Sequence, residues 1–319
     1  MSTITVALAL ALAAGSDSLS RFAWREVHLG MEVQLTGYAP NDSVARTAAR
    51  AAFAEIARLE DVLSDWRPGS EVRRLEHRTG AWQEVSPELF AVLRLARDVA
   101  RASGGAFDPT VGPLTVLWRE ARRAGVLPAT TALRHARTTV GHRLLDLDTV
   151  GRRVRLARPG MRLDLGGVAK GFILQRALGV LAGHGVSRAL VQAGGDLVAG
   201  DAPPGRDGWD VAAPLAIPRL AAVARALRYQ ALATSGPIEQ FLDANGRRYS
   251  HVVDPRTGLG VTSPVVATVV ADDAALADAL ATALTVLDEA PGRVLLRRFR
   301  VTGGTCRPAV PRTRTSHGT

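Results

Sequence analysis

Lys170 stands at a bend between a strand and a helix, where a cation is unexpected. The stretch MRLDLGGVAKGFILQRAL, residues 161–178, reads as an alternating apolar strand, a pair of glycines and then a helix. Backbone N–H groups at such a bend lie at the positive end of the helix dipole, where an acidic side chain is more favourable than a lysine. Lys170 therefore predicts a bound anion, and a tight turn with a solvated lysine is the alternative.

Asp278 and Thr282 are four residues apart in the stretch ADALATAL, so a helix would place both on one face. A carboxylate and a hydroxyl are hard oxygen ligands. With a backbone carbonyl they suffice for Mg²⁺, which keeps several water ligands and binds substrate phosphates. The alternative is that Thr282 packs in the core and Asp278 is an ordinary surface acid.

Two further segments place polar side chains at strand ends. In QAGGDLVAG a glycine pair leads from a strand into Asp196, which puts a carboxylate at a sheet edge, although Gly-Asp after a strand also forms ordinary turns. In YSHVVDPRTG, His251 stands in an expected strand and is followed at a turn by Asp254 and Arg256. Imidazole titrates near neutral pH, so the cluster indicates proton transfer, whereas a lone buried histidine is more often structural.

Alternating strands and helices, without repeats or a linker, must position these side chains. Asn41 to Ser43 cap a long helix that reaches Trp66, and Ser86 with Pro87 begins a second helix, over residues 89–102. Residues 106–114 read as a loop. Further strands are expected at 31–38, on both sides of Gly151, and at 188–194, 209–213, 227–233, 250–253 and 265–270, and further helices up to about 183 and over 272–287.

Composition indicates one soluble globular unit. The 319 residues, 47% hydrophobic and 22% charged, are enough for a core that needs no disulfide. Lys and Arg exceed Asp and Glu by 40 to 30, but the excess is diffuse, and no basic helix with interleaved aromatics and no zinc spacing favours nucleic acid as a partner. Cys306 is the single cysteine, which excludes a disulfide framework and a cysteine metal cluster.

The two ends of the chain carry separate expectations. Residues 6–14 are an apolar run followed by small residues, which resembles a secretory signal without its positively charged start. The run is too short to span a bilayer. We expect residues 1–20 to be a signal or a disordered segment and the protein to be exported, either periplasmic or membrane-associated, with a cytoplasmic protein as the alternative. Residues 303–319 are expected to be a disordered tail.

Six ordered motifs resemble the ApbE family, the FAD:protein FMN transferases: GGAFDPTVGPLTVLW, LDLGGVAKGF, VQAGGDLVAG, ATSG, YSHVVDPRTG and ADALATAL. The similarity runs from about Gly30 to Leu287. It implies an α+β fold, a single domain over residues 21–302 with mixed sheets and flanking helices around a flavin cleft. It also implies FAD as substrate, Mg²⁺, and attachment of FMN through a phosphoester to a Thr or Ser hydroxyl of an acceptor protein, typically a subunit of a membrane redox complex.

The resemblance also implies roles for individual residues. Asp278, Thr282 and a backbone carbonyl near Ala169 would hold the magnesium, and Lys170 would face the pyrophosphate of FAD. His251 would be the general base for the incoming hydroxyl, and Asp254 would orient it or take that role. Trp66 occupies a place where the family usually carries a tyrosine near the adenine. Flavin or nucleotide contacts are further implied for Asp108, Asp196, Ser235 and Arg256.

Some positions depart from the family pattern. The segment 29–31, Leu-Gly-Met, stands where the family has Met-Gly-Thr, Gln175 where an Asp is common and Glu76 where an Asn is usual. The sequence leaves three activities open: transfer of FMN, Mg²⁺-dependent hydrolysis of FAD to FMN and AMP, and flavin binding without transfer. The retained metal and base residues argue against the last, because binding alone needs no metal.

Overall fold

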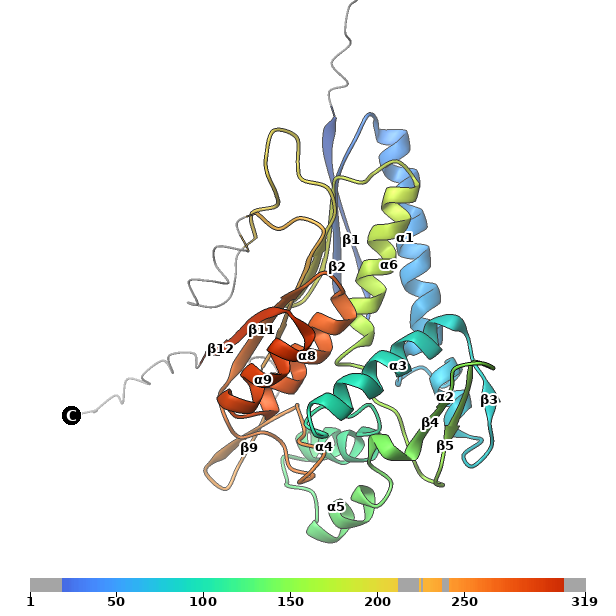
Figure 1. Ribbon diagram of the computed structural model, residues 1–319, viewed down its shortest axis with the longest axis vertical. Helices are drawn as coiled ribbons and strands as arrows, with labels where there is room; N and C mark the ends of the chain where they lie inside the picture. The colour runs from blue at the N-terminus through green and yellow to red at the C-terminus, as the bar shows by residue number, and fades with distance from the viewer. Residues whose placement is uncertain (1–18, 212–223, 225, 237–240, 307–319) are drawn as a thin grey trace, which may run out of the picture.

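A computed structural model describes residues 19–211, 224, 226–236 and 241–306, and a seven-stranded antiparallel sheet is its largest element (Figure 1). The strand order is β1-β2-β6-β7-β8-β11-β12, so strands far apart in the sequence are neighbours in the sheet. The strands are β1 (Ser20–His28), β2 (Met31–Ala39), β6 (Ala189–Ala193), β7 (Asp196–Ala199), β8 (Ala231–Ser235), β11 (Val266–Ala271) and β12 (Thr302–Cys306).

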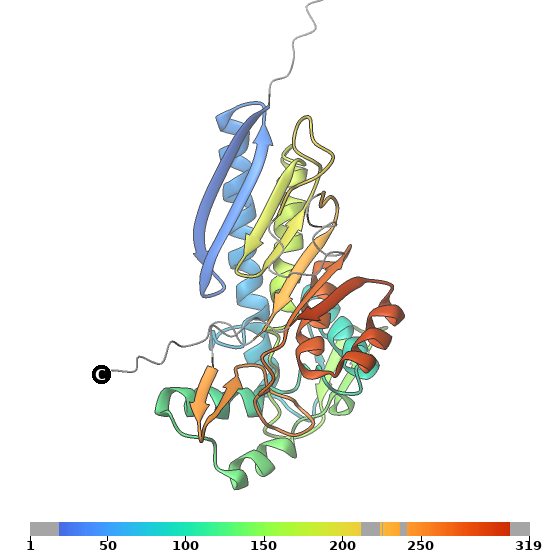
Figure 2. The ribbon, with the colours of Figure 1, turned by 90° about the vertical axis from the view of Figure 1, so that its left-hand side faces the viewer.

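Three helices, α1 (Asp42–Leu63), α6 (Ala169–Gly183) and α8 (Ala274–Val286), cover one face of this sheet. Figure 2 shows the sheet with α1 and α6 behind it. Side chains alternate along β2, so Val33 and Leu35 face the helices and are buried. The helix α6 lies between α1 and α8 and is apolar around most of its circumference, because it is packed on several sides.

Gly171 allows α6 and α8 to approach closely. A Cβ atom at this position would lie 2.1 Å from the carbonyl oxygen of Ala274, the first residue of α8. A side chain of any size would push the two helices apart. The contact brings the first turn of α6, which carries Lys170, beside the turn of α8 that carries Asp278.

All remaining elements except one helix form a second group below the sheet in Figure 1. A separate apolar cluster there includes Leu114, Trp118, Leu133, Leu242 and Val253. The elements are α2 (Glu71–Glu76), α3 (Pro87–Ala102), α4 (Gly112–Ala124), α5 (Thr130–Arg137), a 3-10 turn (His142–Leu144), the sheet β3-β5-β4 (Gln83–Glu84, Arg153–Leu156, Leu145–Asp148) and the hairpin of β9 (Phe241–Ala244) and β10 (Arg247–Ser250). The helix α9 (Glu289–Phe299) packs instead against α8 and β12.

Most of the expected helices and strands are confirmed, with shifted ends. Asn41 and Ser86 cap α1 and α3 as predicted, each accepting a bond from a backbone N–H three residues on. The first helix ends at Leu63 rather than Trp66, because the Ser64 hydroxyl accepts bonds from the N–H groups of residues 66 and 67 and turns the chain.

Other expectations are wrong. The strand β8 begins at 231 rather than 227, and the segment from 209 makes an isolated bridge with Leu227, its end at 212–213 lying outside the described residues. The expected loop at 106–114 includes the start of α4, and β1, α5 and α9 were not predicted. Residues 303–306 belong to β12, which pairs with β11, so this part of the expected tail is ordered.

Residues 1–18 and 307–319 lie outside the described residues, and so do most of the predicted signal and the rest of the predicted tail. Within the described part of the chain no helix is both long and apolar enough to cross a bilayer.

Candidate active site

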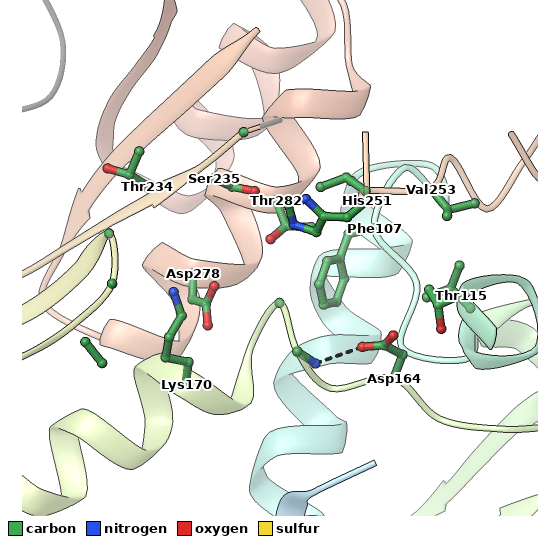
Figure 3. A pocket seen from close by; sticks show the side chains of 18 of the residues that line it. Phe107, Thr115, Asp164, Lys170, Thr234, Ser235, His251, Val253, Asp278 and Thr282 are labelled. Carbon is green, nitrogen blue, oxygen red and sulfur yellow. Dashed lines mark hydrogen bonds between the residues drawn. The ribbon is translucent and has the colours of Figure 1, made fainter. Parts of the chain in front are cut away.

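A cavity of about 630 Å³ opens where the ends of the sheet strands meet the second group of elements. Its walls come from segments far apart in the sequence, and Figure 3 shows how their side chains converge. Six of the residues singled out from the sequence line it: Asp108, Lys170, Ser235, His251, Asp278 and Thr282.

Lys170 is paired within the protein. Its ammonium lies 2.8 Å from Oδ2 of Asp196, a buried carboxylate at the start of β7, although among the described residues no group donates an aligned hydrogen bond to that oxygen. The other oxygen of Asp196 accepts a 3.0 Å bond from the backbone of Thr234. The alternative of a solvated lysine is therefore wrong, because Asp196 compensates the charge of Lys170. Lys170 still lines the cavity, and its contact to a bound anion stays a prediction.

Asp278 is the most perturbed acid of the site. It is 4% exposed, so the alternative of an ordinary surface acid is wrong. Burial, together with the nearby negative charge of Asp196, raises the pKa of Asp278 to about 7, although Lys170 and a hydrogen bond from the Gly171 N–H oppose the rise. Figure 3 shows the side chains of Lys170 and Asp278 pointing toward one another. Two buried carboxylates therefore share one lysine. Lys170 can compensate only one of their two negative charges, so a further positive charge would be favourable here.

Thr282 lies one turn of α8 beyond Asp278, as the spacing predicts, and faces the same cavity. Its hydroxyl oxygen would be 2.8 Å from a Cβ atom at Gly167, so the backbone of Gly167 lies next to the Thr282 side chain. Ala169, predicted to offer the carbonyl, stands at the first position of α6 and lines a neighbouring cavity instead.

The oxygens at this point of the cavity suit a small hard cation. Among the described residues no three His, Cys, Asp or Glu side chains form a metal cluster, so a cation here would depend on Asp278, Thr282 and backbone carbonyls. That donor set fits Mg²⁺, which takes one or two carboxylates and completes its shell with water and phosphate oxygens. The excess negative charge of the Asp196 and Asp278 pair favours the same conclusion.

His251 follows β10 directly rather than standing inside a strand, and it lines both this cavity and the neighbouring one. Both carboxylate oxygens of Asp254 accept bonds from Arg256, at 2.9 and 3.0 Å. Asp254 and Arg256 do not line either cavity. The pair therefore stabilises the loop. A catalytic role for Asp254 and a flavin contact for Arg256 stay predictions.

Asp108 is buried and holds a loop together. One carboxylate oxygen accepts bonds from the backbone and hydroxyl of Thr110, and the other accepts a 2.6 Å bond from the backbone of His142. Asp108 reaches the cavity wall, as does Ser235 at the end of β8. Their contacts to a flavin or nucleotide stay predictions.

The neighbouring cavity, about 650 Å³, holds Trp66. The indole is 61% exposed, and the guanidinium of Arg119 lies 3.9 Å from the centre of its ring. Arg119 is fixed by Asp65 at 2.8 Å and Asp164 at 3.1 Å. Burial and the charge of Asp164 raise the pKa of Asp65. Lys170 and His251 line this cavity too, so it adjoins the first.

Several residues of the site were not predicted. Asp164, Gly167 and Phe107 stand inside quoted motifs, but only the fold shows that they line the cavity. Arg119 lies on α4, a helix that was not predicted from the sequence.

Comparisons with known proteins agree with this arrangement. The model of the ApbE family matches residues 29–303. A FAD:protein FMN transferase from Treponema pallidum is 35% identical over 264 residues, which cover 77% of this chain and 73% of the relative. The crystal structure of Pseudomonas stutzeri flavinyl transferase ApbE in its apo form has a TM-score of 0.77 at 26% identity and covers 89% of this chain and 90% of that one.

An ApbE protein from Thermotoga maritima has a TM-score of 0.76 at 27% identity, with 90% of this chain and 97% of that one covered. The match therefore extends over the sheet, the second group of elements and the cavity between them. The α+β fold with its single domain is thereby confirmed, and the chain belongs to the ApbE family.

Proposed function

We propose that the protein transfers FMN from FAD to a hydroxyl of an acceptor protein and releases AMP. One observation carries the proposal: a single cavity gathers a lysine from α6, a carboxylate and a hydroxyl from α8, and a histidine from the loop after β10. These are the groups that cleavage of a pyrophosphate by a hydroxyl requires. Relatives that bear the name FAD:protein FMN transferase support it.

The reaction forms one bond and breaks one. The hydroxyl oxygen of the acceptor attacks the phosphorus on the FMN side of FAD, the anhydride bond to AMP breaks, and AMP leaves with that electron pair. His251 accepts the hydroxyl proton at a ring nitrogen. Lys170, fixed by Asp196, keeps a positive charge where negative charge develops on the phosphoryl oxygens.

We propose that Asp278 and Thr282 hold Mg²⁺ with backbone oxygen from the Gly167 turn. When bound, Mg²⁺ supplies a second positive charge to the phosphate oxygens. The protein contributes the carboxylate, the hydroxyl and a buried position that strengthens their interaction with a cation. Assay in EDTA against added Mg²⁺ tests this dependence, and full activity in EDTA would contradict it.

The acceptor is proposed to be a protein with an exposed Thr or Ser, of the kind found in subunits of membrane redox complexes, and the enzyme is proposed to be exported. Export is supported by the apolar run at residues 6–14. Expression of the full chain followed by cell fractionation tests this, because an exported enzyme is found outside the cytoplasm in a shortened form.

The decisive experiment incubates the enzyme with FAD, Mg²⁺ and Thr- or Ser-containing peptides from membrane redox subunits of the source organism, and weighs the peptides by mass spectrometry. An added FMN phosphoester supports the proposal. Free FMN and AMP without peptide adducts indicate a hydrolase, and FAD that stays intact indicates flavin binding alone. Asp272→Asn, an exposed acid just before α8, is the matched control for Asp278→Asn and keeps activity.

A further inference from the structure

His251 lies in a loop whose two ends are joined by backbone hydrogen bonds. The Ser250 N–H donates to the Val261 carbonyl at 2.8 Å, and the Val261 N–H donates to the Val252 carbonyl at 2.9 Å. The loop extends the small hairpin of β9 and β10, which is not part of the seven-stranded sheet. The position of His251 relative to Lys170 and Asp278 therefore depends on what this loop packs against.

Trp118, on α4, contacts the segment before His251 and the segment that returns after it. Its indole N–H donates a 2.9 Å hydrogen bond to the Gly258 carbonyl, and the residue is 1% exposed. The ring centre lies 5.3 Å from that of Tyr249, two residues before His251. A Cβ atom at Gly260 would be 3.3 Å from the indole, so the returning backbone also touches the ring.

Arg137, on α5, strengthens the same attachment. Its guanidinium donates a 2.7 Å bond to the Arg256 carbonyl. Gly258 has φ +80°, and a Cβ there would lie 3.0 Å from the Arg137 side chain and 3.3 Å from Leu114. The turn of the loop is thus fitted closely between α4 and α5.

The other end of α4 is attached to the segment that leads to Lys170. A Cβ atom at Gly112 would lie 2.7 Å from the Arg162 carbonyl oxygen, and Val111 forms a bridge with the same residue. Gly112 and Trp118 are six positions apart, which is a rise of about 9 Å along a helix. One short stretch of α4 therefore contacts both the segment that leads to Lys170 and the loop that carries His251.

We propose that Trp118 is a positioning residue that sets the reach of His251 toward the reacting phosphate, with Arg137 in support. This inference rests on the proposed function, because it assigns to His251 the removal of the acceptor proton. Trp118 is not among the residues that line the cavity. Its effect on the reaction is transmitted by the Gly258 hydrogen bond and by the ring contacts.

The test is a double-mutant cycle between Trp118→Phe and His251→Ala, measured as single-turnover AMP release with excess enzyme, so that slow variants remain measurable. Trp118→Phe keeps an aromatic ring and removes the N–H. We expect it to lower the single-turnover rate constant, and with it the steady-state kcat, about tenfold, while the steady-state KM for FAD changes by less than about twofold, since a small misplacement of a catalytic group is costly. In the His251→Ala background the same change should have no further effect.

Leu133→Ala is the matched control, because Leu133 belongs to the same apolar cluster on α5 and is not among the residues that bond the loop. It should lower the melting temperature and leave kcat unchanged at temperatures where the protein is folded. Arg137→Met, at a position near the surface, tests the second attachment and should lower kcat in the same way if Trp118→Phe does not fold.

Three outcomes contradict the inference: losses from Trp118→Phe and His251→Ala that multiply, a Leu133→Ala loss in kcat as large as that of Trp118→Phe, or a rise in the KM for FAD without a fall in kcat. Failure of the proposed function is distinguishable, since the natural protein would then leave FAD intact or release FMN without a peptide adduct.

Discussion

The raised pKa of Asp278 makes a prediction about stability that needs no substrate. In the unfolded chain an aspartate titrates near pH 3.9, whereas burial and Asp196 raise the pKa of Asp278 to about 7. The folded protein therefore holds a proton on Asp278 between these values and the unfolded chain does not. The stability due to this group is complete below about pH 4 and is lost as the pH rises toward 7.

The size of the effect follows from the difference in pKa. Each unit corresponds to about 1.4 kcal/mol, so raising the pH from 5 to 8 should cost the folded state roughly 3 kcal/mol through Asp278 alone. Asp278→Asn removes the titration and keeps the shape and an oxygen that can accept the Gly171 bond. Without metal, the free energy of unfolding of the variant, relative to that of the natural protein, should therefore increase by roughly 3 kcal/mol from pH 5 to pH 8.

Urea unfolding at pH 5, 6, 7 and 8 in EDTA measures this, with the free energy of unfolding compared between the two proteins at each pH. Comparison of the two cancels other titrating groups, such as Asp65 and Glu76, whose pKa values burial also raises. Added Mg²⁺ should stabilise the natural protein more at pH 8 than at pH 5, because the cation binds the carboxylate and competes with the proton.

Parallel pH profiles for the natural protein and Asp278→Asn would refute the reasoning. Such a result would mean that Asp278 is ionised in the folded state throughout, so that Lys170 compensates it fully. A Mg²⁺ effect of equal size in the variant would separately refute Asp278 as a ligand.

The remaining predictions concern other residues near Asp278. Lys170→Met should lower the unfolding free energy at pH 8 by about 3–5 kcal/mol, because it leaves buried Asp196 without its cation, and should cost less at pH 5; denaturant unfolding checks both values. His251→Ala should lower the transfer rate by roughly 10² or more and leave FAD affinity, measured by flavin fluorescence, unchanged. Gly171→Ala should destabilise by about 1–3 kcal/mol because α8 occupies the space, whereas Gly179→Ala on the same helix, with no atom within 4 Å, should stabilise by about 0.5–1 kcal/mol; thermal melts of both variants distinguish a steric effect from helix propensity.

The sequence was most informative where a short stretch determines its own structure. The caps of α1 and α3 were predicted from Asn41 and Ser86, because a cap depends on residues within one turn. The common face of Asp278 and Thr282 follows from the helical repeat alone. Neither prediction required knowledge of distant contacts.

Predictions that depended on partners from other segments were less successful. The ion pair of Lys170 with Asp196 was not predicted, because Asp196 is 26 positions away in the chain and no local pattern reveals that they meet. The sequence left open the alternative of Asp278 as a surface acid, because only the fold shows that α8 is covered by α6 and by the sheet. The helix α4 was missed because Gly112 and Pro113 at its start read as loop residues.

The strand order also bears on when the enzyme can begin to work as it is synthesised. The cavity draws on residues from Met31 to Thr282, and β11, which lies between β8 and β12, does not form until nearly the whole chain has been made. A ribosome releases the N-terminal hairpin long before its sheet partner β6 exists. A nascent chain thus cannot hold FAD in a complete cleft, and chains that stop before α8 would carry Lys170 without the carboxylate and hydroxyl that face it.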